Sequence, residues 1–503
     1  YAKRLQGNGG RVFVMTGDGE LQEGQIYESL QTAVNQQLNN LTVIVDHNKL
    51  QSDKPVTEIS DLGDLESKFR AFGWHVARCN GHDFSVLDQV FSELRQITDK
   101  PKIVIADTIK GRGISFMEHP TALRAGNGYY RWHAGAPDDE SFQRGYEELI
   151  SRTNNSLKEL GINPLTLEDY PADPKVASGV SSEFVVDAYG AALVEAGAKR
   201  SDLIVLGADL TADCRLREFE KRFPERFIEN GIAEQDMVSM AGGLALSGLL
   251  PVVNTFASFL SARANEQVYN NACEQTRIIY ANHYAGVIPA GPGQSHQSIR
   301  DISLFGSLPN FVIVQPCNAV ETHLVVDYAI NEATENCVLR INIGASPQVI
   351  ELPADYRLTF GCGVALTEGN DAVMFAYGPV MLNEALTAAE LLSHQGFSLK
   401  VINMPWLNRV DFDWLREAID TVPTIYVLED HAPVGGLGDM LLNRMNDEGL
   451  LDKKVFHKFA VSGYPACGTP SEALNFHGLD GASLAKQILD RYRLKKSAAR
   501  FER

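Results

Sequence analysis

The sequence predicts an α/β protein of three doubly wound domains, the first of which is incomplete on its N-terminal side. Three observations lead to this fold class. Short apolar, β-branched runs alternate with segments of helical periodicity along most of the chain. The 503 residues are enough for about three domains of ordinary size. Fewer strands precede the glycine-rich turn around Asp18 than a doubly wound sheet normally has.

The stretch of residues 11–50 organises the first domain. Its apolar run at residues 12–15 ends at the turn Gly17-Asp18-Gly19, a helical pattern follows, and residues 41–45 form a second apolar run. We predict a strand–turn–helix–strand unit whose strands are parallel neighbours and whose two turns share the carboxyl edge of the sheet.

The residues at this edge suit a magnesium ion with a diphosphate. Asp18 and Asn48 leave the two strands and supply oxygen ligands, which Mg²⁺ prefers, while phosphate oxygens and water can complete its octahedron. Gly17 and Gly19 let backbone N–H groups approach a diphosphate, and the helix that follows offers its positive end. A Gly-Asp-Gly sequence alone also fits an ordinary turn, so the prediction depends on the strands and on Asn48.

The rest of the first domain, residues 1–150, continues the alternation of helices and strands. Residues 151–180 are polar and contain several prolines, which predicts a linker. Within the domain we expect a helix, a strand, a helix and a strand at residues 65–72, 75–79, 86–97 and 103–106.

The second domain, residues 181–350, carries an acidic residue in an unusual place. Glu234 lies where a short strand turns into a glycine-rich apolar helix. A carboxylic acid in such a dry place can share a proton with a ring nitrogen. The alternative is a carboxylate that only stabilises the N-terminus of the helix. Phe256 and Phe259 follow another strand and, by pattern alone, would be core residues of a helix start.

The third domain, residues 355–503, again alternates strands with helices. Its predicted strands are residues 372–376, 399–403, 424–428 and 454–459.

Charge and cysteine content narrow the function classes. The chain has 45 Lys+Arg against 64 Asp+Glu, a formal net charge of −19, which disfavours nucleic acid and anionic membranes as partners. The most apolar stretch, residues 237–253, contains glycines and a proline and predicts a buried helix that runs into a strand. The seven cysteines are scattered without CxxC pairs, which indicates a reducing, cytoplasmic location.

Six sequence motifs, taken together, resemble those of one protein family. They are GDGELQEG at residues 17–24, DHNKL at 46–50, RWHAGAP at 131–137, GIAEQ at 231–235, TFASF at 255–259 and GPGQSHQ at 291–297. This set resembles the thiamine-diphosphate enzymes of the transketolase family more than the deoxyxylulose-phosphate synthases or the 2-oxo-acid dehydrogenases. The resemblance extends over nearly the whole chain.

The resemblance implies thiamine diphosphate, held through Mg²⁺ or through Ca²⁺ or Mn²⁺ in its place. Asp18, Asn48 and the backbone carbonyl of Leu50 would hold the metal. Glu234 would share a proton with the aminopyrimidine ring, and His133 and His296 would also be catalytic. Other cofactor contacts are expected from Gly17, Gly19, Glu23, Asp209, His133, Phe256 and Phe259, and substrate contacts from His283, His296 and Arg340.

Two of these assignments have ordinary alternatives. Without the resemblance, His133 is a solvent-facing loop residue and Arg340 is a strand-end arginine in a surface ion pair.

The resemblance also implies a homodimer, in which Asp18 and Glu234 serve different halves of a site between subunits, with Glu23 near the interface. An upstream segment with cofactor-contacting histidines is absent from the sequence, and truncation, cleavage or a separate chain all remain open.

The implied reaction is transfer of a two-carbon ketol unit from a ketose, such as a ketose phosphate, to an aldose. Three departures leave the substrates open. Val186 stands where the family has a phosphate-binding arginine, and Asp213 stands where it has a serine. Ala290 or Gly291 stands where the family has an acidic residue that contacts substrate hydroxyls. A different thiamine-diphosphate-dependent acyl or ketol condensation, a 2-oxo-acid decarboxylation, or a catalytically silent relative are the alternatives.

Overall fold

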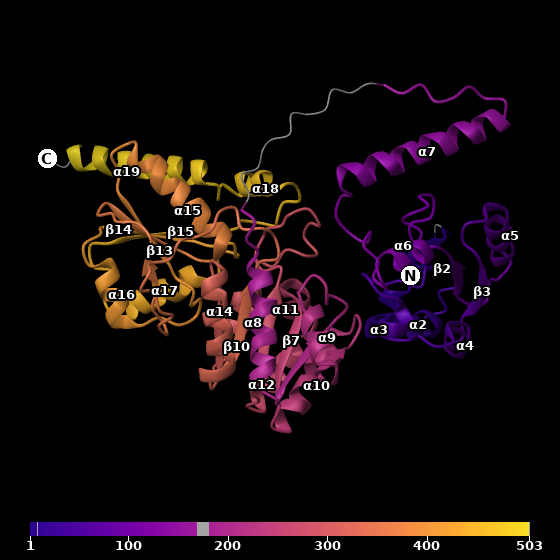
Figure 1. Cartoon of the computed structure of the whole chain (residues 1–503), viewed down its shortest axis with the longest axis horizontal. Coiled ribbons are helices and arrows are strands. Elements are labelled where there is room, and N and C mark those ends of the chain that lie inside the picture. The colour runs from indigo at the N-terminus through magenta and orange to yellow at the C-terminus, as the bar shows by residue number, and fades with distance from the viewer. Residues whose placement is uncertain (8, 169–180, 502–503) are drawn as a thin grey trace. The chain divides into compact units, whose positions relative to one another are not determined.

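The computed structural model describes residues 1–7, 9–168 and 181–501, and the chain divides into two compact units (Figure 1). The first unit comprises residues 1–176 with 229–233, and the second comprises residues 177–228 and 234–503. Each unit is built on parallel β-sheet, and the three sheets of the two units confirm the predicted α/β class.

The first unit contains a four-stranded, fully parallel sheet in the order β1-β2-β4-β3. Its strands are β1 (Val12–Gly17), β2 (Leu41–His47), β3 (His75–Asn80) and β4 (Lys102–Asp107). Gly17 pairs with Asp46, so the turns after β1 and β2 lie at one edge, which confirms the parallel unit predicted at residues 11–50. The helices are α1 (Ala2–Leu5), η1 (Gly19–Gln22), α2 (Gly24–Asn35), α3 (Val56–Ile59), α4 (Leu65–Ala71), α5 (Phe84–Leu94), α6 (His119–Ala125) and α7 (Asp139–Glu159).

Strand β1 is an edge strand, although it precedes the glycine-rich turn. Phe13 is 54% exposed and Met15 is 71% exposed, whereas β4 is almost entirely buried. Strands of parallel sheets are normally covered on both faces, whereas β1 is mostly exposed in this structure.

Helix α7 corrects the predicted linker. The polar composition of residues 151–180 indicates a linker, but α7 continues to Glu159 from an N-cap at Asp138, whose carboxylate accepts from the N–H of Ser141. Polar residues suit this helix because most of its surface is exposed. Residues 169–180 of the predicted linker lie outside the described residues.

The second unit begins with a six-stranded sheet in the order β6-β5-β7-β8-β10-β9. Strands β5 (Leu203–Gly207), β7 (Leu250–Phe256), β8 (Ile279–His283), β9 (Phe311–Val314) and β10 (Asn336–Ile341) are buried throughout, and β6 (Phe227–Glu229) is partly buried. The helices are α8 (Val185–Lys199), α9 (Arg217–Arg222), η2 (Pro224–Arg226), α10 (Glu234–Leu246), α11 (Ala257–Arg263), α12 (Asn265–Cys273), α13 (Asp301–Gly306), α14 (Ala319–Asp327) and η3 (Tyr328–Glu332).

The same unit carries a five-stranded sheet in the order β11-β13-β12-β14-β15, parallel except for the short β11. Helices α15 and α19 pack against each other on it (Figure 1). The strands are β11 (Val364–Ala365), β12 (Ala372–Ala376), β13 (Leu399–Asn403), β14 (Thr424–Leu428) and β15 (Val455–Phe459), and the helices are α15 (Gly378–Ser393), α16 (Phe412–Ile419), α17 (Leu437–Asp447), α18 (Pro470–His477) and α19 (Gly481–Phe501).

Residues 237–253 cover most of α10 and the start of β7, which confirms a helix that runs into a strand. The helix is buried on one face only, because Met240 is 37% and Leu246 is 66% exposed. Among the described residues, the structure contains no helix with the length and apolar content needed to cross a membrane.

Candidate functional site

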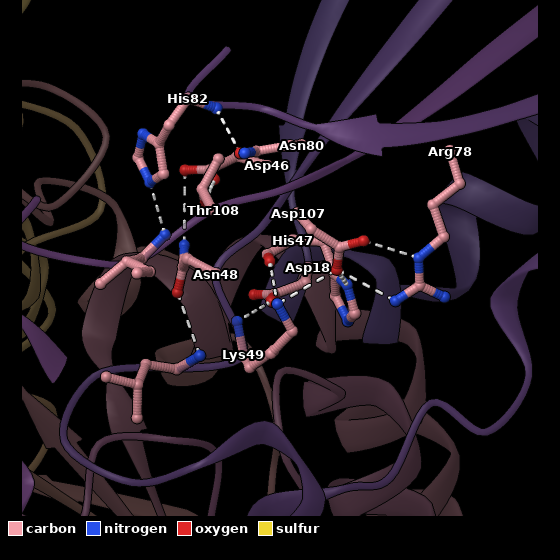
Figure 2. A network of polar contacts seen from close by, with 12 residues as sticks. Asp18, Asp46, His47, Asn48, Lys49, Arg78, Asn80, His82, Asp107 and Thr108 are labelled. Atoms are coloured by element: carbon pink, nitrogen blue, oxygen red, sulfur yellow. Dashed lines mark hydrogen bonds and ion pairs between the residues drawn. The ribbon is translucent and has the colours of Figure 1, made fainter. Parts of the chain in front are cut away.

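The first half of the candidate site lies at the carboxyl edge of β1 and β2 (Figure 2). Asp18 is buried and precedes η1. Its Oδ1 accepts from the N–H of Gly19 at 2.8 Å, and its Oδ2 accepts from the N–H of Lys49 at 2.5 Å. Burial raises the pKa of the Asp18 carboxyl, against the effect of these two N–H donors. The bond to Lys49 places the Asp18 carboxylate beside the turn that carries Asn48.

The turn after β2 supplies the other predicted metal ligands. Asn48 Oδ1 accepts from the N–H of Leu50 at 3.0 Å, and Asn48 Nδ2 lies 3.4 Å from Asp46 Oδ2. Asp46 also accepts from the hydroxyl of Thr108 (Figure 2). The structure therefore brings Asp18, Asn48 and Leu50 together, and a carboxylate, an amide oxygen and a backbone carbonyl are donors that fit Mg²⁺.

A further acidic residue near Asp18, Asp107, contacts three basic side chains. Asp107 accepts from Arg78 Nε at 2.7 Å and lies 2.9 Å from His47 Nδ1 and 3.1 Å from Lys49 Nζ. The hydrogen bond from Arg78 is the main reason that the pKa of Asp107 lies well below its usual value. No group of three or more His, Cys, Asp or Glu side chains within the described ranges forms a metal site. A metal at Asp18 would accordingly need the neutral oxygens and ligand phosphates.

His133 and Glu23 lie on the same unit. The Nδ1 of His133 is 2.8 Å from Lys110 Nζ, which also donates to the carbonyl of Gln51. Desolvation of the ring, and then the charge of Lys110, lower the pKa of His133, so the ring is neutral at pH 7. Glu23 is the N-cap of α2.

The second unit presents Glu234 at the start of α10. Glu234 is only 2% exposed, and its Oε1 accepts from Arg263 Nη1 at 2.7 Å. Within the part of the chain that the structure describes, the buried Oε2 has no hydrogen-bond partner. A buried carboxylate oxygen without a donor is costly, so Oε2 marks a place where a ligand donor fits.

Four rings form an aromatic cluster in the same domain, defined by Phe256, Phe259, Tyr284 and His296. Phe256 lies 5.4 Å from Phe259 and 5.2 Å from Tyr284, and His296 lies 5.2–5.9 Å from the other three, measured between ring centroids. Desolvation, and then the charge of Arg263, lower the pKa of His296. Flat apolar rings near a buried acid fit the ring system of thiamine diphosphate.

His283 lies deeper than a substrate-binding residue should. Its ring is fully buried, its Nε2 is 3.2 Å from Asn254 Oδ1, and the ring packs edge-on against Tyr189. Desolvation lowers the pKa of His283 to about 3, so the ring is neutral. Among the described residues, the buried Nδ1 of His283 has no hydrogen-bond partner, and the substrate contact of His283 stays a prediction.

Arg340 is also fully buried. Its guanidinium donates to Asp301 at 2.7 Å and to Asp430 at 3.1 Å, and it also bonds Gln315. Burial alone would lower the pKa of Arg340, but the two carboxylates outweigh it and raise the pKa. Arg340 is thus not in a surface ion pair, and its contact with a substrate phosphate stays a prediction. Arg340 joins the six-stranded sheet to the domain of the five-stranded sheet.

The remaining predicted positions are spread around this domain. Asp209 follows β5 with a φ of 57° and is buried, and Asp213 is exposed in the following loop. Val186 is buried in α8 and Ala290 is buried in the loop after β8. An apolar side chain closed off in the core cannot replace an arginine at a phosphate.

Arg263 and Tyr284 were not among the predicted site residues. Arg263 lies four residues after Phe259, and this helical spacing is the signal that could have placed it beside the aromatic cluster. Tyr284 follows His283 with a φ of 59°, which no sequence pattern indicates.

Three family models match the chain. They are described as transketolase thiamine diphosphate binding domain at residues 8–126, transketolase pyrimidine binding domain at residues 185–346 and transketolase C-terminal domain at residues 361–484. Together with the three parallel sheets, they define an α/β protein of the thiamine-diphosphate-binding class. The chain belongs to the transketolase family.

Individual proteins agree with this assignment. A transketolase-like protein 2 from Mus musculus is 32% identical over 492 residues, which cover 95% of this chain and 76% of the relative. A transketolase from Homo sapiens is 29% identical over 489 residues, covering 95% of this chain and 75% of the relative. The fold is shared with a solved transketolase from Pichia stipitis in complex with sedoheptulose-7-phosphate, with a TM-score of 0.52, 20% identity and coverage of 97% and 77%.

A second solved structure matches only part of the chain. It is described as a split gene transketolase in an inactive beta4 tetramer, and it aligns with a TM-score of 0.54 and 30% identity. The match covers 62% of this chain and 98% of that chain.

Proposed function

We propose that this protein transfers a two-carbon ketol unit from a ketose donor to an aldehyde acceptor, with thiamine diphosphate and a divalent cation as cofactors. The observation that carries the proposal is the buried Oε2 of Glu234, which has no hydrogen-bond partner among the described residues and lies near the aromatic cluster through Arg263. When bound, the cofactor supplies a nucleophilic carbon that can hold the electrons of a broken carbon–carbon bond.

The residues proposed to bind the cofactor come from both units. Asp18, Asn48 and the carbonyl of Leu50 would hold Mg²⁺, with Ca²⁺ or Mn²⁺ as substitutes, and Gly17 and Gly19 would lie against the diphosphate. Glu234 would hold the proton shared with the aminopyrimidine ring, and Phe256 and Phe259 would contact that ring.

The two predicted catalytic histidines fit a role in proton transfer. The pKa values of His133 and His296 are both lowered, so each ring is neutral at pH 7 and can accept a proton from a substrate hydroxyl. Their proposed role is to orient the substrate and to move protons at its oxygens.

A different thiamine-diphosphate reaction, such as a 2-oxo-acid decarboxylation, is the second candidate. It is favoured by the positions that depart from the sugar-phosphate pattern. Val186 is buried, the guanidinium of Arg340 is held by Asp301 and Asp430, and Asp213 adds a negative charge. A carboxylate near a phosphate opposes its binding.

We also propose a homodimer in which Asp18 of one subunit and Glu234 of the other serve one cofactor. A further polypeptide segment would cover the exposed edge strand β1, since Phe13 and Met15 would otherwise present an open apolar edge. The match to a split gene transketolase supports a family precedent for separate chains.

All seven cysteines are free thiols, which supports the proposed cytoplasmic location.

Product analysis tests the reaction. The protein is incubated with thiamine diphosphate, Mg²⁺, an aldehyde acceptor and one donor at a time: a ketose, a ketose phosphate or pyruvate. We expect a product two carbons longer than the acceptor from a ketose donor, and a rate at least ~10²-fold lower for Glu234→Gln, which should keep much of the cofactor binding.

Three results would contradict the proposal. Release of CO₂ from pyruvate without ketol transfer would favour the second candidate. Absence of both turnover and cofactor binding, with the proposed further segment present, would identify a catalytically silent relative. Normal turnover of Glu234→Gln would refute the role of Glu234.

A further inference from the structure

The contact between Arg263 and Glu234 joins the ends of two helices. Arg263 is the last residue of α11, and Glu234 is the first residue of α10. The 2.7 Å hydrogen bond from Arg263 Nη1 to Glu234 Oε1 connects a partly exposed guanidinium to a buried carboxylate. Such a bond between two charged groups is shorter and stronger than one between neutral groups.

Two further contacts hold Arg263 in place. Its guanidinium carbon lies 4.1 Å from the centroid of the Phe259 ring, a cation–π arrangement. Its backbone carbonyl accepts from Gln235 Nε2 at 3.1 Å. Gln235 belongs to the first turn of α10, so both the backbone and the side chain of Arg263 are tied to the helix that carries Glu234.

The two carboxylate oxygens of Glu234 differ in their hydrogen bonding. Oε1 is occupied by Arg263, whereas the buried Oε2 has no partner among the described residues. Fixing one oxygen of a carboxylate also fixes the direction of the other. Oε2 is consequently presented in a single direction, and a group that meets it must carry a proton.

We infer that Arg263 is a positioning residue, which orients the Glu234 carboxylate so that Oε2 meets the protonated ring nitrogen of the aminopyrimidine. The inference rests on the proposed role of Glu234. The contact to Phe259 extends the same function, because Phe259 packs against Phe256 and His296 in the aromatic cluster. Arg263 thus links the acid to the rings expected beside the cofactor.

The test compares Arg263→Ala and Arg263→Lys with a control, Arg409→Ala. Arg409 pairs with Glu335 at 3.0 Å in the same unit, away from Glu234. We expect Arg263→Ala to slow exchange of the C2 proton of bound thiamine diphosphate about 10- to 100-fold. The affinity for thiamine diphosphate with Mg²⁺, measured by calorimetry, should change less than about threefold.

Chemical rescue separates positioning from general stability. Added guanidinium should restore part of the exchange rate in Arg263→Ala, and Arg263→Lys should lie between that variant and the unaltered protein. A variant that only loosens the fold would gain nothing from guanidinium. Unchanged exchange in Arg263→Ala, or a loss that guanidinium and lysine do not reduce, would overturn the inference.

A second measurement does not depend on turnover. In a crystal structure of cofactor-free Arg263→Ala, we expect the Glu234 carboxylate to rotate or to occupy several orientations. If the unaltered protein shows no C2 exchange, the proposed function fails, and this structure still decides the positioning role. A Glu234 side chain unmoved in Arg263→Ala would overturn it.

Discussion

The buried Asp18 carboxylate lowers the stability of the ligand-free protein but suits a bound cation. Its carboxylate is buried between the N–H groups of Gly19 and Lys49, and burial raises its pKa. A raised pKa means that the charged form is less stable in the folded protein than in the unfolded chain. A bound cation would relieve this penalty, which is the expected behaviour of a metal ligand.

Replacement of this carboxylate separates binding from stability. Asp18→Asn should weaken the Mg²⁺-dependent binding of thiamine diphosphate at least ~10-fold without lowering the unfolding temperature of the cofactor-free protein. Calorimetry and thermal unfolding measure the two effects. The control is Asp83→Asn at the N-cap of α5 in the same unit, which should leave the binding unchanged. Unweakened binding in Asp18→Asn would remove Asp18 from the metal site.

The positions of some site residues could be predicted from the sequence, and those of others could not. The proximity of Asp18 and Asn48 could be predicted because parallel neighbouring strands end at one edge of a sheet. The burial of His283 and Arg340 could not. A polar residue at a strand end can face a cleft or a neighbouring domain, and only the packing of Asp301 and Asp430 against Arg340 decides this.

At the scale of elements, strong apolar runs were predictable and short strands were not. Strands β12, β13 and β14 have the predicted bounds because each is a five-residue, mostly apolar run. The two-residue β11 has too few residues to show a pattern, and β9 was missed although Phe311–Val314 is apolar. The start of the linker was misjudged because an exposed polar helix has nearly the composition of a loop.

The turn between β14 and α17 depends on close packing around a buried acid. Glu429 ends the β14 region, and its Oε2 accepts from the N–H of Gly438 at 3.4 Å. A Cβ at Gly436 would lie 2.1 Å from Glu429 Oε2, so a side chain there would displace the Glu429 carboxyl. Desolvation raises the pKa of Glu429 to about 8, and the folded protein therefore holds this carboxyl protonated at pH 7.

This raised pKa has a definite sign for stability. Glu429 binds its proton more tightly in the folded state, so its contribution to the free energy of unfolding is largest below pH 4.5 and falls as the pH rises to about 8. The loss is on the order of 1 kcal/mol for each pH unit in this window. Denaturant titrations at several pH values should show that Glu429→Gln removes this slope. Parallel profiles for the two proteins would contradict the assignment.

At the scale of the whole molecule, the two groups of candidate site residues lie on separate compact units. Asp18 with Asn48 belongs to the first unit, and Glu234 with the aromatic cluster belongs to the second. The three domains of the transketolase family account for both units. The central claim is that one thiamine diphosphate is bound by Asp18 of one subunit and by Glu234 of its partner.

Complementation between two variants, at a thiamine diphosphate concentration at which each alone is inactive, tests this claim most directly. Asp18→Asn and Glu234→Gln are co-expressed, and C2 proton exchange of thiamine diphosphate is measured in the mixed dimers. A shared site predicts that one of the two sites in each mixed dimer is intact, so a statistical mixture should recover about one quarter of the unaltered rate. A mixture as inactive as either variant alone would show that both residues serve a site within one subunit, and would contradict the account.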